Sequence, residues 1–263
     1  MDLGLAGRTA IVLASSKGLG RATAEALAAE GCNVGMCARN TSELEKAAAD
    51  LRDRYRVKIF AQPCDVSSAE DLKVFFTHAQ GALGSADILV NNSGGPPSGT
   101  TDTFSDEEWR AAFEGNFMSV VRACRYVVPS MKTRRWGRIL TIASTSAKEP
   151  IPGLVLSNSF RAAVAGFSKT LAIEVGPFNV LANCVLPGSF LTDRNRQLGA
   201  VIAEQRGIPF AELVGEWEKG VPLQRMGDPL EFGRVMAFLA SEQGRYITGA
   251  CIVVDGGSVR ALY

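Results

Sequence analysis

Short apolar, β-branched runs alternate with longer stretches of helical periodicity along almost the whole chain. Strand followed by helix in regular turn predicts parallel βαβ units, and hence an α/β fold built on a doubly wound parallel sheet. In such sheets, ligands bind beyond the carboxyl ends of the strands. Strands are predicted over residues 9–13, 33–37, 58–63, 88–91, 138–142, 180–185 and 251–254, and helices over 20–30, 42–54, 69–81, 106–131 and 157–175.

Composition narrows the class of protein. The chain has 263 residues, 46% of them apolar, which is sufficient for one core, so we expect a single domain over residues 1–263. Lys and Arg number 28 against 27 Asp and Glu, a balance that argues against nucleic acid or an acidic membrane as the main partner. The six cysteines are dispersed, and His78 is the single histidine, so a histidine metal site has little support. With neither a signal peptide nor a membrane span, we expect a cytoplasmic protein that binds a small molecule and no metal.

A glycine loop follows the first predicted strand and opens the first predicted helix. In this setting glycines permit a tight turn, and backbone N–H groups at the start of the helix bind a pyrophosphate. If the turn at Ala14 requires a positive φ, its Cβ costs about 1 kcal/mol. The residues predicted to form this dinucleotide site are Ser15, Ser16, Lys17, Gly18, Leu19 and Gly20.

Further motifs follow the glycine loop in a fixed order. They are Cys64-Asp65-Val66, Asn91-Asn92-Ser93-Gly94, Pro187-Gly188 with Thr192, and the segment 247–257. Together they resemble the short-chain dehydrogenase/reductase family over nearly the whole chain. The resemblance implies a Rossmann-type fold with adenine held by Asp65 and Val66. It also implies a turn at the cofactor and a loop beside the nicotinamide, formed by Asn92, Gly94, Pro187, Gly188 and Thr192.

Residues 144–164 resemble the catalytic segment of that family, in which a Ser is followed about a dozen residues later by Tyr-x-x-x-Lys. Aligned without a gap, Ser144 takes the Ser position, Ser157 the Tyr position and Arg161 the Lys position. Asn116 matches the family's catalytic Asn. The resemblance therefore implies a catalytic set of Asn116, Ser144, Ser157 and Arg161, with Arg161 also at the nicotinamide ribose.

Cations at the end of the second predicted strand indicate the cofactor. A dinucleotide site that grips a free ribose 2′-hydroxyl usually has a carboxylate here, whereas a 2′-phosphate requires a cation. Arg39 and Lys17 supply two cations and no carboxylate. NADP(H) is therefore favoured over NAD(H), although both side chains can also be solvated charges at loop ends.

The altered centre changes the expected chemistry. In the family the Tyr delivers a proton while a Lys lowers its pKa and holds the ribose. Ser157 is a much weaker acid, and Arg161 stays protonated, so it donates hydrogen bonds but does not readily relay a proton. General acid catalysis contributes ~10²–10⁴ in rate, so its loss costs about 3 to 6 kcal/mol. Turnover is therefore either slow or dependent on another acid.

Structural roles for the same residues are open at this point. Ser157 can cap the helix predicted to begin there, Arg161 can make an ion pair, and Asn116 can mend a break in its helix through the side-chain amide. A tyrosine from elsewhere in the chain could replace the missing catalytic one. Of the four, only the last is expected to approach an active site, and that site belongs to a neighbouring subunit. The four are Tyr55, Tyr126, Tyr246 and Tyr263.

Residues 195–228 break the alternation and carry many apolar side chains, so we expect a lid over an apolar substrate. Amphipathic packing on the sheet is the alternative.

The family pairs the helices predicted here over 106–131 and 157–175, which implies a homotetramer or dimer. Small and apolar residues suited to that contact are Ala162, Ala163, Val164, Phe167 and Leu171. A cluster of four basic residues has two interpretations, a docking site for an acidic acyl carrier or a solvated helix end. The cluster consists of Lys132, Arg134, Arg135 and Arg138.

Two functions remain. The preferred one is an NADP(H)-dependent oxidoreductase that reduces a ketone or oxidises a secondary alcohol with an altered proton donor; the pattern is similar to 3-oxoacyl-thioester reductases. The alternative is a catalytically impaired protein that binds nucleotide or ligand for sensing or assembly. The departures at Leu13-Ala14, Ser157 and Arg161 favour the alternative, whereas Ser144, Asn116 and the cation pair favour catalysis.

Overall fold

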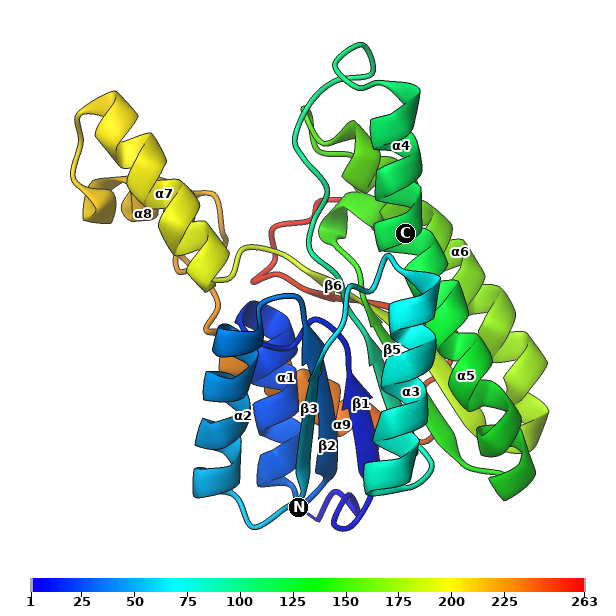
Figure 1. Ribbon diagram of the computed structural model, residues 1–263. Helices are drawn as coiled ribbons and strands as arrows, with labels where there is room; N and C mark the ends of the chain where they lie inside the picture. Colours follow the sequence, from blue (N-terminus) through cyan, green and yellow to red (C-terminus); the bar gives the residue numbers. More distant parts are fainter. Residues whose placement is uncertain (1, 263) are drawn as a thin grey trace.

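Seven parallel strands form one sheet in the order β3-β2-β1-β4-β5-β6-β7 (Figure 1). This computed structural model describes residues 2–262, apart from the side chains of Arg194 and Leu198. The chain winds from β1 outward to β3, returns to β4 and winds outward to β7, so the connections diverge between β1 and β4. The strands are β1 (Thr9–Val12), β2 (Asn33–Ala38), β3 (Ile59–Pro63), β4 (Ile88–Asn91), β5 (Gly137–Ile142), β6 (Val180–Pro187) and β7 (Cys251–Val254).

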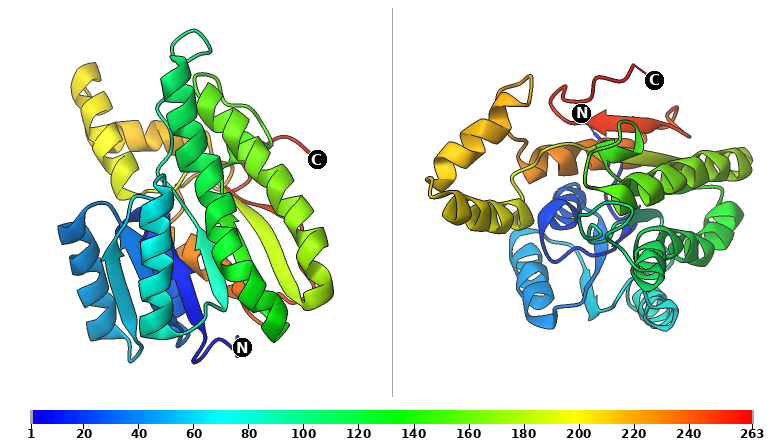
Figure 2. Two further views of the ribbon diagram at one scale, coloured as in Figure 1. Left: turned by 45° about the vertical axis from the view of Figure 1, so that its right-hand side comes forward. Right: turned by 90° about the horizontal axis from the view of Figure 1, so that it is seen from above.

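Helices cover both faces of the sheet (Figures 1 and 2). One face carries α1 (Gly18–Ala29), α2 (Thr41–Arg54) and α9 (Pro229–Ala240), and the other carries α3 (Ala69–Leu83), α5 (Ser119–Arg134) and α6 (Val155–Val175). Successive residues of β1 therefore enter different cores, Ala10 on one face and Ile11 on the other. This double covering explains why the strands are continuously apolar in the sequence, and it confirms the predicted doubly wound sheet.

Two elements differ from the prediction. The helix expected over residues 106–131 is interrupted: α4 (Asp106–Phe113) leads into a π-helical turn (Glu114–Met118) before α5 begins. Helix α9 was not predicted, although Asp228 and Glu231 form a capping box with Pro229 in the first turn. It packs closely along α1, where a Cβ on Gly233 would overlap the Ala22 carbonyl group.

The segment expected to form a lid contains two helices. α7 (Asp193–Arg206) and α8 (Phe210–Lys219) form a pair that projects beyond the carboxyl end of the sheet, on the side of α1 (Figures 1 and 2). Arg206 donates two hydrogen bonds to the Glu216 carboxylate, at 2.6 and 2.9 Å, which joins the two helices. Across residues 2–262, no helix has both the length and the apolar character needed to cross a membrane.

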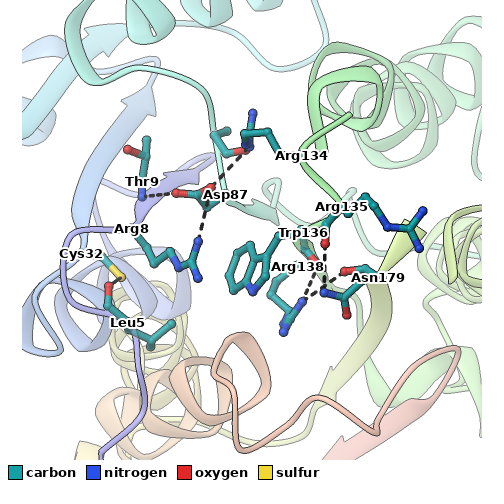
Figure 3. A network of polar contacts seen from close by, with 12 residues as sticks. Leu5, Arg8, Thr9, Cys32, Asp87, Arg134, Arg135, Trp136, Arg138 and Asn179 are labelled. Carbon is teal, nitrogen blue, oxygen red and sulfur yellow. Dashed lines mark hydrogen bonds and ion pairs between the residues drawn. The ribbon is translucent and has the colours of Figure 1, made fainter. Parts of the chain in front are cut away.

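The opposite end of the sheet is held by a polar network (Figure 3). The Asp87 carboxylate accepts the Thr9 N–H at 3.0 Å and pairs with Arg134 at 3.4 Å. Arg138, only 1% exposed, lies 4.2 Å from the centre of the Trp136 ring and pairs with Glu242 at 3.5 Å.

This network bears on the suggested acyl-carrier dock. The Arg138 guanidinium is buried, Arg134 is bound to Asp87, and Arg135 donates to the Pro177 carbonyl at 3.0 Å. These three arginines therefore hold the amino end of the sheet together, away from the carboxyl ends where ligands of this fold bind. Because Arg138 is buried, it fits neither of the two interpretations, a docking site for a carrier or a solvated helix end.

Candidate active site

A trough runs along the carboxyl ends of the strands at the switch point between β1 and β4. It consists of two adjoining cavities, of about 570 and 250 Å³, which share Ala14, Lys17, Ser93, Gly94 and Gly95. The larger extends over the end of β2, and the smaller reaches β5 and α6. Its walls include these residues predicted from the sequence: Ser16, Lys17, Gly18, Leu19, Arg39, Asp65, Val66, Asn92, Gly94, Arg161, Pro187 and Thr192.

The glycine loop has the tight turn expected of it. Ala14 has a φ of 46°, which confirms that a residue with a Cβ occupies a left-handed position. Gly20 is required for space, because a Cβ there would lie 2.5 Å from Asn92 Nδ2 and 2.6 Å from the Ala14 carbonyl oxygen. Asn92 Nδ2 donates to that carbonyl at 3.0 Å and so fastens the β1 loop to the β4 loop.

Helix α1 starts directly beneath the trough. No side chain among the described residues caps its first turn at Lys17. The first N–H groups of α1 are consequently left for a ligand. Ser15, predicted to contact the cofactor, is fully buried below the loop, and its hydroxyl donates to the Val12 carbonyl at 2.8 Å.

The larger cavity is lined by the two cations expected at its far end and by two carboxylates. Arg39 follows β2 and is exposed, and Lys17 Nζ lies 3.2 Å from the Glu43 carboxylate. Asp65 lines the same cavity and is oriented by the N–H and hydroxyl of Ser67, at 2.9 and 2.7 Å. Glu43 was missed by sequence reasoning. It lies three residues into α2, so only the folded loop brings it to Lys17.

Three serines gather at the end of β5. Ser144 follows the strand, and its hydroxyl accepts the Ser146 N–H at 3.1 Å. The Ser146 and Ser157 hydroxyl oxygens lie 3.0 Å apart, so Ser146, which is 2% exposed, links the two predicted residues. Ser157 does not cap α6, because that helix begins at Val155 with Leu154 in the cap position. Ser146 was not singled out from the sequence, although the Ser-x-Ser pattern was present.

Arg161 is buried on α6, and its Nη1 donates to the Ile142 carbonyl at 3.1 Å. It also lines the smaller cavity. Behind it on β6, a hydrogen bond with Cys251 and burial raise the pKa of the Cys184 thiol, while the Arg161 charge opposes this effect. The guanidinium is thus held against the end of β5 by the Ile142 carbonyl, and it faces the trough.

Asn116 lies in the π-helical turn and is 4% exposed. Its Nδ2 donates to the Ala112 carbonyl at 3.1 Å, which mends the broken helix as one interpretation expected. Its Oδ1 accepts from the Ser93 hydroxyl at 3.3 Å, and Ser93 lines both cavities. Asn116 is therefore joined to the trough through Ser93.

The described tyrosines lie away from this centre. The Tyr55 hydroxyl interacts with Arg54 and Glu25, Tyr126 stacks on Phe76, and Tyr246 is fully exposed. Tyr263 lies outside the described residues.

In the loop after β6, which was expected to lie beside the nicotinamide, Thr192 caps α7 by accepting the Asn195 N–H at 3.3 Å. Gly188 packs against Asp255, where a Cβ would approach to 2.5 Å, so it shapes the loop without lining the trough.

Comparison of the sequence with known proteins identifies the family of this chain. Residues 13–259 match the family model described as enoyl-(acyl carrier protein) reductase. Nodulation protein G of a Rhizobium species is 36% identical over 258 residues, which cover 96% of this chain and 97% of that protein. The chain belongs to the short-chain dehydrogenase/reductase family. Its relatives include oxidoreductases that act on carbonyl groups, such as the 3-oxoacyl-(acyl-carrier-protein) reductase of Chlamydia muridarum, 34% identical with 96% and 98% of the two chains covered.

Solved structures of this family superimpose closely. L-Sorbose reductase from Gluconobacter frateurii, complexed with NADPH and L-sorbose, has a TM-score of 0.97 at 33% identity with both chains fully covered. An NADPH-bound short-chain oxidoreductase from Pseudomonas aeruginosa, described as containing an atypical catalytic centre, has a TM-score of 0.90 at 32% identity, with 98% and 99% covered.

Proposed function

We propose that the chain is an NADP(H)-dependent oxidoreductase that reduces a ketone or oxidises a secondary alcohol with an altered proton donor. The observation that carries this proposal is that Ser146 joins Ser144 and Ser157 just beyond β5, while Arg161, which lines the smaller cavity, contacts the end of the same strand. Close structural relatives hold NADPH, and the trough fits a dinucleotide. Gly20 leaves space beneath it, α1 offers uncapped N–H groups, and Arg39 and Lys17 stand at the far end.

When bound, NADPH supplies the hydride that is added to the substrate's carbonyl carbon. The hydroxyl groups of Ser144 and Ser157 donate hydrogen bonds to the carbonyl oxygen, where negative charge develops. Ser146 sets the spacing of these two groups, because it contacts both. Arg161 adds a positive charge at the end of β5. The oxygen then takes its proton from water, since neither serine is an acid of useful strength near neutral pH.

The substrate is a small carbonyl or alcohol compound. The resemblance covers enzymes for acyl thioesters and for a sugar, so a test panel must include both polar and apolar ketones. We expect α7 and α8 to form the wall on the substrate side. The assembly is a homodimer or homotetramer.

The decisive experiment measures NADPH and NADH binding by calorimetry and then ketone reduction in a single turnover. Reduction is expected at a slow rate, with Ser144→Ala lowering it a further ~10²–10³-fold, as for removal of one oxyanion donor. Turnover unaffected by Ser144→Ala removes that residue from the mechanism.

The second candidate is a nucleotide-binding protein without redox turnover. It is favoured by the engagement of Ser157 with Ser146 and of Arg161 with the Ile142 carbonyl, which leaves these groups fixed in the protein. NADPH that binds but is not oxidised by any ketone in the panel would support this candidate instead.

A further inference from the structure

The cation site at the far end of the trough contains its own negative charge. Glu43 Oε1 and Oε2 each lie 3.2 Å from Lys17 Nζ. Both residues line the 570 Å³ cavity together with Arg39 and Asn40. Asn40 fixes the start of α2 by accepting the Glu43 N–H at 3.0 Å, so the carboxylate is carried on an ordered helical turn.

The Lys17–Glu43 pair joins the glycine loop to the first turn of α2, and both residues line the larger cavity. Lys17 belongs to the glycine loop after β1, and Glu43 belongs to the helix that follows β2. Their side chains are 48% and 43% exposed, so the contact is accessible to water and can be exchanged for another partner. Among the residues that the structure describes, no ion pair is formed by Arg39. Before a ligand binds, Lys17 is therefore paired with a carboxylate, whereas Arg39 is not.

We propose that Glu43 is a specificity-determining residue that restrains Lys17 and lowers the affinity of the trough for the 2′-phosphate of NADP(H). The proposal rests on the proposed function, because it requires NADPH to bind here. A 2′-phosphate that approaches Arg39 meets a lysine already neutralised by Glu43. It must either draw Lys17 away or bind close to a like charge, and both weaken its binding. NADH carries no phosphate at this position and does not compete for Lys17.

Replacing Glu43 by Gln tests this role, since it removes the charge and keeps the size of the side chain. Calorimetry on the full chain is expected to show NADPH bound about two- to fivefold more tightly, the range set by an exposed ion pair. NADH affinity is expected to stay unchanged. The gain should shrink at high salt, because screening weakens exposed charge pairs.

The matched control is Glu45→Gln on the same helix. Glu45 pairs with Arg52 at 3.5 Å and does not line the cavity, so the charge change is the same but the location differs. It should leave both affinities unchanged. In a Lys17→Met background, Glu43→Gln should lose most of its effect, because the two residues act as a pair.

Four results would overturn the role of Glu43. An unchanged NADPH affinity in Glu43→Gln shows that Lys17 is not restrained. Weaker NADH binding shows that Glu43 accepts from the ribose 2′-hydroxyl instead. An equal gain in NADPH affinity in Glu45→Gln shows that the effect comes from net charge alone. An undiminished gain in the Lys17→Met background shows that Glu43 does not act through Lys17. Failure of NADPH to bind the parent protein at all would count against the proposed function itself.

Discussion

Ala14 holds a left-handed backbone conformation at the point where β1 passes into the glycine loop. Its φ of 46° is one that glycine adopts without the steric cost of a Cβ. We predict that Ala14→Gly raises the free energy of unfolding by up to about 1 kcal/mol. Chemical denaturation measures this, with Ala86→Gly as control, a loop alanine whose φ is not positive. Destabilisation by both variants would mean that no strain resides at Ala14.

Ser157 and Arg161 offer a direct test of the altered centre. We predict that Ser157→Tyr combined with Arg161→Lys raises the rate of ketone reduction by up to ~10²–10⁴, the contribution of a general acid. The pair is required, because a tyrosine without a nearby shorter cation keeps its ordinary high pKa and meets the arginine. Single-turnover rates of both single variants provide the comparison. No gain with NADPH still bound would assign these positions to another chemistry.

At the scale of elements, the start of α9 is sensitive to pH. Arg225 donates to both carboxylate oxygens of Glu231 at 2.7 Å and, with the Asp228 N–H, lowers the pKa of Glu231 from 4.5 to about 2. A lowered pKa contributes stability above about pH 4.5, and this is lost as the pH falls toward 2. We predict that Glu231→Gln costs at most about 1 kcal/mol at neutral pH and almost nothing near pH 2. Unfolding curves from pH 7 to 2 measure the difference, and a constant offset at all pH values would contradict it.

The α7–α8 pair is held by aromatic packing within itself. A Cβ on Gly199 would lie 2.7 Å from both Phe210 and Trp217, so these rings press on α7. We predict that Phe210→Ala with Trp217→Ala weakens substrate binding at least tenfold while NADPH affinity changes little, because the wall over the substrate loosens. Gly199→Ala, which retains the apolar area but displaces the rings, should act in the same direction. If neither dissociation constant changes, the segment is packing and not a lid.

At the scale of the whole molecule, α6 presents a row of small and apolar residues to the outside. Ala162, Ala163 and Ile173 are exposed, the last by 71%, whereas Val164 and Leu171, also expected in a helix contact, are buried against the sheet. We predict a homodimer or homotetramer in solution. Sedimentation should show Ile173→Asp shifted toward monomer and Val201→Asp, exposed on α7, unchanged. A monomeric parent at high concentration would contradict this.

The doubly wound parallel sheet could be predicted because buried parallel strands are continuously apolar and alternate with helices, whereas the order of the strands comes from the structure. The helix break at Asn116 was expected only as one alternative, from the family resemblance, because a π-helical turn leaves the hydrophobic periodicity on either side intact. Glu43 carries no motif and reaches Lys17 only when the start of α2 meets the glycine loop, whereas Ser146 had only the Ser-x-Ser pattern to mark it. Helix α9 was not predicted because it contains Gly233, a residue that is unfavourable in an isolated helix. The folded protein requires a glycine there, because α9 packs against Ala22 of α1.

That contact also joins two parts of the chain that are synthesised far apart in time. α1, whose first turn lies below the trough, is covered by a helix near the other end of the chain. A nascent chain that has left the ribosome as far as α8 therefore still exposes the apolar flank of α1 to chaperones and proteases. That flank of α1 is covered only when α9 packs on it, so we expect the first turn of α1 to take its final place below the trough late in folding.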